Sequence, residues 1–157
     1  MAAQLPDRIL FNGEFLNLYS NPLESYWNNL KKVRPSFFSI PDCTRGYIAS
    51  WEIRKDKLLL TEIDGTYNRN FIFFNKSARY SLLRLFPRSK SRPVKATWFS
   101  GKLRIPIGKM TLYEPTGYDS RFEREVILTI DKGDVIKNVT LDFTEKSLIV
   151  NSEVKQN

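Results

Sequence analysis

The stretch that decides the fold class reads VKATWFSGKLRIPIGKM (residues 94–110), TLYEPTGYDSRFE (111–123) and REVILTID (124–131). Apolar and polar side chains alternate over 94–99, as they do along a half-buried strand. Ser100-Gly101 is a turn dipeptide, because glycine accepts the positive φ of a tight hairpin. Leu103 and Ile105 continue the apolar face past this turn. The pattern predicts a β-hairpin whose second face carries Lys95, Phe99, Lys102 and Arg104.

Strand and turn signals recur on both sides of this stretch. Asn12-Gly13 predicts a hairpin between residues 8–11 and 14–19, and alternation over 47–54 and 58–63 predicts another. Further strands are expected at 71–74, 110–113, 124–130, 135–143 and 148–150. The chain is therefore predicted to be one globular domain over residues 1–157, mainly β (α+β), with two short helices. About eight to ten short strands would form an antiparallel β barrel or sandwich, two alternatives that the pattern leaves open.

Two segments carry helix signals. Asn21 is a predicted cap, Pro22 suits the first helical position, and Glu24 can reach back to the cap amide. Asn75 similarly predicts a cap for a helix over 76–86, which Pro87 would end. The apolar stripe of the first helix consists of Leu23, Trp27 and Leu30.

The charge of the chain is unevenly distributed. The net charge is +8, yet residues 65–113 carry eleven Lys or Arg side chains and no Asp or Glu. That segment therefore contributes +11 and the remainder −3. Such asymmetry favours a polyanionic or acidic partner, unless carboxylates from elsewhere fold against the cations and compensate them.

Several classes of chemistry find no support in the composition. The chain has no histidine, which removes the usual general base and the commonest zinc ligand. Cys43 has no second cysteine to pair with and no imidazole to activate it, so a structural thiol is expected. Nucleotide-binding glycine motifs and calcium or magnesium loops are absent, and we predict neither a cofactor nor a metal site. With no apolar run of about 18 residues and no secretion signal, a cytoplasmic protein is expected.

Two weaker features lie near the central stretch. Glu123 and Glu125 share one face of a predicted strand and are the candidate pair for a carboxylate-based enzyme, although a solvated acidic face is the simpler interpretation. Tyr113, Tyr118 and Phe122 are candidates for an aromatic recognition rim or for a cover over one end of the core.

The chain contains the motifs NPLE (21–24), RGYIA (45–49) with WEI (51–53), LFP (85–87), WFSG (98–101) with LRIP (103–106), and GY (117–118). Together these motifs resemble those of a family of small uncharacterised bacterial proteins. The resemblance spans about residues 8–136. It implies one compact bacterial domain and no mechanism.

These observations favour a non-catalytic bacterial binding protein that acts through protein–protein contact with an acidic partner surface, as an immunity-type or accessory factor. The alternative is a nucleic-acid-binding protein that uses the same basic hairpin and loop, and the third hypothesis is the carboxylate-based enzyme. The predicted binding residues are Arg88, Lys90, Arg92, Lys95, Phe99, Lys102 and Arg104. Cations would contact phosphates or carboxylates, and an exposed Phe99 could stack on a base.

Overall fold

A computed structural model describes residues 2–70, 75–144 and 149–151 and shows a mainly β fold. In chain order the elements are β1 (Asp7–Phe11), β2 (Glu14–Leu18), α1 (Pro22–Asn29), β3 (Tyr47–Arg54), β4 (Lys57–Asn70), β5 (Asn75–Tyr80), α2 (Leu82–Leu85), the 3-10 helix η1 (Pro87–Ser89), β6 (Val94–Lys95), β7 (Gly101–Leu112), β8 (Arg121–Asp131), β9 (Asp134–Asp142) and β10 (Ile149–Asn151). None of the described helices is long and apolar enough to cross a membrane.

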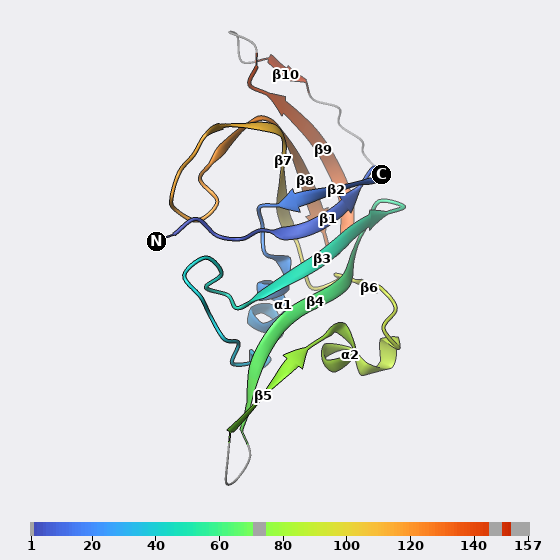
Figure 1. Cartoon of the computed structure of the whole chain (residues 1–157). Helices are drawn as coiled ribbons and strands as arrows, with labels where there is room; N and C mark the ends of the chain where they lie inside the picture. Colours follow the sequence, from blue (N-terminus) through green and yellow to red (C-terminus); the bar gives the residue numbers. More distant parts are fainter. Residues whose placement is uncertain (1, 71–74, 145–148, 152–157) are drawn as a thin grey trace.

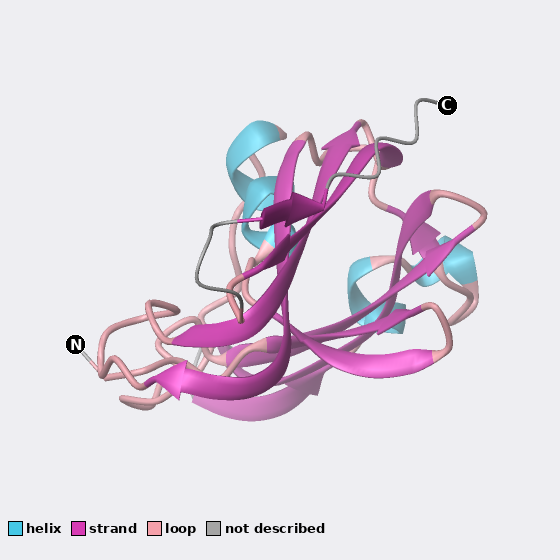
Figure 2. Cartoon of the chain, turned by 90° about the horizontal axis from the view of Figure 1, so that it is seen from above, coloured by secondary structure: helices cyan, strands magenta, loops and turns pink. Residues whose placement is uncertain are grey.

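The described strands all belong to one sheet that curls into a nearly closed barrel (Figures 1 and 2). Its order is β2-β1-β3-β4-β9-β8-β7, with β10 beside β9 and with β5 and β6 beside β4. Of the two predicted architectures, the barrel is therefore the one observed. One pairing departs from the antiparallel prediction, since β1 runs parallel to β3.

Two seams close the barrel. The residues just after β2 meet β7, where Tyr19 N donates to Arg104 O at 2.8 Å and Arg104 N donates to Ser20 Oγ at 3.1 Å. On the opposite side β4 meets β9 at the single register pair Lys57 and Asp134. Both seams are narrow, so side-chain packing inside the barrel contributes much of the closure.

The core is continuous and rich in aromatic rings. Predicted inward residues of β3 and β8 are buried, among them Tyr47, Trp51 and Leu128. Helix α1 packs its Tyr26 and Trp27 onto this core, where their rings meet other aromatic side chains at centroid distances of 5.0–6.2 Å. Offset and edge-on ring pairs of this kind add stabilisation beyond the burial of their area.

The predicted hairpin over residues 94–105 is wrong. β6 pairs with β4, with Lys95 opposite Leu59, and β7 pairs with β8, with Leu103 opposite Leu128. The intervening residues turn inward, and the Trp98 indole donates to Pro22 O at 3.0 Å. Alternation indicates a strand but does not name its partner, and pairing with two long strands buries more apolar surface than a local hairpin would.

The predicted helix over 76–86 is also wrong. Residues 75–80 form β5, whose backbone hydrogen bonds go to the second half of β4, and the helix α2 covers only 82–85. Its cap is Ser81, whose hydroxyl accepts from Arg84 N. The strand predicted at 71–74 lies outside the described residues.

Helix α1 is confirmed, although its predicted capping is not. The Asn21 side chain caps no amide and donates instead to the Tyr118 hydroxyl at 3.1 Å. Glu24 turns away from the cap and accepts from Arg34 Nε at 2.9 Å and from the Tyr47 hydroxyl at 2.5 Å. Burial, followed by the Glu24 charge, raises the pKa of the Tyr47 phenol.

A buried carboxylate links the first strand to the centre of the sheet. Asp7 is fully buried, and its oxygens accept from Arg45 Nη2 at 2.8 Å, Ala49 N at 3.0 Å and Trp51 Nε1 at 3.1 Å. Burial raises the pKa of the Asp7 carboxyl above its usual value. The Arg45 charge and the hydrogen bonds from Ala49 and Trp51 offset part of this rise. The Arg45 guanidinium also donates to Leu5 O at 2.7 Å. The Asp7–Arg45 pair thus connects β1, β3 and the residues that precede each of these strands.

We predict that Asp7→Asn lowers the free energy of unfolding by about 3–5 kcal/mol, because it leaves the Arg45 charge buried without its counter-ion. Urea unfolding followed by tryptophan fluorescence measures this loss. Asp42→Asn, at an exposed position, is the matched control and should change stability by less than about 0.5 kcal/mol. Equal losses in the two variants would contradict the assignment.

Candidate binding surface

The predicted loop cations remain available for binding. Arg88, Lys90 and Arg92 are exposed, and none of their side chains forms an ion pair with a residue that the structure describes. The loop holds a defined shape, since Lys90 and Ser91 both take positive φ values, of 53° and 63°. Backbone bonds from Lys90 N to Pro87 O and from Arg92 N to Ser89 O connect it to η1.

Two predicted residues of the central stretch do not belong to an exposed basic face. Phe99 is only 9% exposed and packs into the core, so it cannot stack on a base. Its burial follows from the turn at 96–100, where Gly133 N donates to Phe99 O and fixes this segment over the β8–β9 turn. Lys95 is already paired, since its Nζ lies 2.8 Å from Asp134 Oδ1.

Arg104 is a structural cation and not a free one. Its guanidinium donates to Glu125 Oε1, at 2.9 Å from Nε, and to the backbone oxygens of Tyr118 and Ser120. The same group lies 5.2 Å from the centroid of the Tyr19 ring. Arg104 therefore uses its charge to fasten the 113–120 loop onto the β2–β7 seam, which the sequence could not reveal because Glu125 is 21 residues away.

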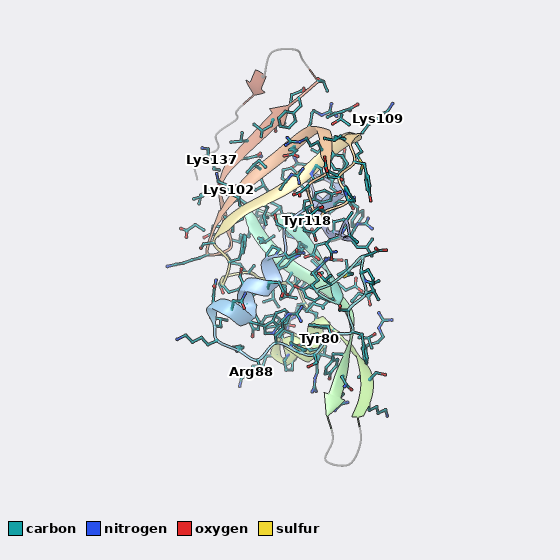
Figure 3. The ribbon with its side chains drawn as sticks, turned by 90° about the vertical axis from the view of Figure 1, so that its left-hand side faces the viewer. Tyr80, Arg88, Lys102, Lys109, Tyr118 and Lys137 are labelled. Atoms are coloured by element: carbon teal, nitrogen blue, oxygen red, sulfur yellow. The ribbon has the colours of Figure 1, made fainter. Side chains whose placement is uncertain are left out.

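Lys102 is exposed and separate from the loop cations. Register pairs place Lys102 opposite Thr129 and Thr129 opposite Lys137, so the two lysines lie in one row across β7, β8 and β9. Figure 3 shows them side by side on the upper part of the molecule, while Arg88 lies on the lower part. The predicted single basic surface is thus divided into two.

The larger basic surface lies where residues 66–70 and 75–93 fold together, and we name these residues the basic lobe. It comprises the second half of β4, with β5, α2, η1 and the following loop, which gather at the lower end of the molecule in Figure 1. Its sequence holds no Asp or Glu, and its seven cations are Arg69, Lys76, Arg79, Arg84, Arg88, Lys90 and Arg92. Within this set, Arg79 lies 2.6 Å from the Asp64 carboxylate.

Strand pairing within the basic lobe sets like charges against each other. In the β4–β5 register Arg69 stands opposite Lys76, an arrangement that destabilises a sheet relative to an opposite-charge pair. The sequence prediction missed this grouping because it assigned 76–86 to a helix, which would have separated the two side chains.

The candidate acidic pair does not form a shared site. Glu125 is bound to Arg104 and lines a cleft of about 340 Å³, whereas Glu123 is not among the residues that line it. Glu123 instead lies against Gly108, where a Cβ atom would come within 2.5 Å of its Oε2. No group of three or more Cys, Asp or Glu residues within the described parts of the chain could hold a metal ion.

The remaining candidates are largely structural. Tyr118 stacks on Tyr19 at 4.9 Å between ring centroids, and Phe122 meets Tyr19 edge-on at 5.6 Å, so both cover the barrel seam. Tyr113 is 62% exposed and does not join them. Cys43 is buried, and its thiol donates to Tyr47 O at 3.4 Å.

No protein family, curated protein or solved structure matches this chain in the three comparisons made. The resemblance noted from the motifs therefore stays a prediction.

We predict that Arg104→Gln and Glu125→Gln each lower the free energy of unfolding by about 3 kcal/mol, since each leaves a largely buried charge without its partner. The double variant should lose less than the sum of the two, which a double-mutant cycle from urea unfolding measures. Lys102→Gln, on the same strand but exposed, should stay within about 0.5 kcal/mol of the parent. Additive losses would show that Arg104 and Glu125 act independently.

Proposed function

We propose that this chain is a non-catalytic binding protein whose basic lobe docks onto an acidic surface of a partner protein. The observation that carries the proposal is the set of exposed cations without carboxylate partners in the described structure, led by Arg88, Lys90 and Arg92. An acidic partner would supply the missing counter-charges and would be attracted over distances of about a Debye length.

The form of the lobe supports docking over turnover. Its cations lie on short elements held by the aromatic core, because Phe86 packs against Tyr26 and stacks on Trp98 at 5.2 and 5.8 Å between ring centroids. The segment that carries the loop cations is therefore anchored to the aromatic core through Phe86. Of the two carboxylates considered for catalysis, Glu125 is bound to Arg104, and the sequence holds no histidine to act as a general base.

Nucleic-acid binding is the second candidate, since the same cations suit phosphate contacts. Burial of Phe99 removes the ring that the sequence offered for base stacking. The rings of Tyr67 and Tyr80 within the lobe are also buried, at 8% and 6% exposure. Among the residues of the lobe that the structure describes, contacts to nucleic acid would then depend on phosphates, without the stacking that single strands usually receive from proteins.

The triple charge reversal Arg88→Glu, Lys90→Glu and Arg92→Glu tests the proposal. We expect a partner captured from lysate of the native host by the immobilised parent chain to be lost with this variant. Capture should weaken between about 50 and 200 mM salt and should survive nuclease treatment. Quantitative mass spectrometry of the eluates measures the change.

The matched control is Lys102→Glu, Lys109→Glu and Lys137→Glu, which makes the same change in charge on the upper part of the sheet (Figure 3). Capture should be unchanged with this control. Equal loss with both triple variants would mean that net charge matters and the lobe does not. A signal that nuclease abolishes would favour nucleic acid as the partner.

A further inference from the structure

A pocket opens on one side of the basic lobe. It has a volume of about 460 Å³, within the range of sites that hold small organic ligands. The described residues that line it come from the segment before β3, from β4, from β5 and from α2, namely Val33, Arg34, Pro35, Ser36, Tyr67, Asn68, Arg69, Tyr80 and Arg84. Four separate parts of the chain thus converge on it.

The lining is cationic, and none of the described residues that form it is a carboxylate. Arg34, Arg69 and Arg84 all contribute to the wall. Arg34 is already paired, because Glu24 holds its guanidinium at 2.9 Å. Arg84 is exposed, has no carboxylate partner among the described residues, and lies 5.9 Å from the centroid of the Tyr67 ring. The guanidinium group of an arginine can donate two parallel hydrogen bonds to a carboxylate or a phosphate.

Neutral donors stand beside the arginines. Ser36, Asn68 and Tyr80 line the same pocket, and the Tyr80 hydroxyl forms no hydrogen bond with a described residue. Burial raises the pKa of Tyr80 to about 12, so the phenol keeps its proton and can donate it to an anion at neutral pH. With Arg84 and three neutral donors, the wall offers more donors than a single carboxylate can use.

The rim adds an apolar contact. Val33 is 93% exposed at the edge of the pocket, and Pro35 lies beside it in the chain. A free inorganic anion would gain nothing from these side chains, whereas the carbon group of an ester would cover them.

From this combination we propose that the pocket is a binding site for a phosphate monoester, with Arg84 and Tyr80 as its principal ligands. The site goes beyond the docking function, because a small monoester can fill it without a partner protein. A phosphorylated side chain of a partner and a free metabolite present the same chemistry. The exposed rim favours an ester in either case.

Isothermal titration calorimetry on the full chain tests this site. The probes are an N-acetylated, C-amidated Gly-phosphoserine-Gly tripeptide, its unphosphorylated form, glycerol 3-phosphate and inorganic phosphate. We expect the phosphotripeptide to bind and its unphosphorylated form not to bind. Tighter binding of glycerol 3-phosphate than of the phosphotripeptide would identify a free metabolite as the source, and the reverse order a phosphorylated protein. Inorganic phosphate should bind more weakly than either ester.

Arg84→Gln should weaken binding of the tighter ester at least tenfold, and Tyr80→Phe, which keeps the ring and the packing, should weaken it severalfold. Arg88→Gln removes a neighbouring exposed cation that does not line the pocket, and is expected to leave affinity within about twofold of the parent. Equal weakening by Arg84→Gln and Arg88→Gln, or no binding of any phosphate probe, would overturn the proposal. Neither result bears on partner capture, which the loop variants measure separately.

Discussion

The buried carboxylate of Asp7 is the constraint on which much of the barrel depends. It joins β1 to the Ala49 amide and the Trp51 indole of β3 and neutralises Arg45, which in turn holds the residues just before β1. A buried charge of this kind is tolerated only when its partners are all in place. The unusual parallel pairing of β1 with β3 is therefore supported by a contact that an antiparallel hairpin would not need.

A second ion pair, between Arg104 and Glu125, plays a comparable role at the β2–β7 seam. Both pairs use charge to fix the position of a loop, and in both the cation is withdrawn from the surface. Three cations of the basic lobe differ from these two, because Arg88, Lys90 and Arg92 are exposed and form no ion pair with a residue that the structure describes.

The lobe combines rigidity with unfavourable electrostatics. Its strands set Arg69 opposite Lys76, and its pocket gathers arginines without a carboxylate in the wall. The aromatic core beneath, including Tyr67 and Tyr80, supplies the packing that tolerates this repulsion. A cluster of like charges on a well-packed core is typical of surfaces that recognise anions, because a bound anion supplies the negative counter-charge.

Sequence alone determined the β-rich class, the first two hairpins, helix α1 and the inward faces of β3 and β8, because alternation and turn chemistry are local properties. It also located the acid-free segment and the exposed loop at Arg88, Lys90 and Arg92. Only the tertiary structure decided that 75–80 is a strand, that Phe99 is buried and that Arg104 is paired. The burial of Phe99 and the pairing of Arg104 depend on residues far away in the chain, whereas β5 pairs with the neighbouring second half of β4. The periodicity of a single segment identifies none of these partners. The candidate pocket arises in the same way, from four segments that meet only when the sheet closes.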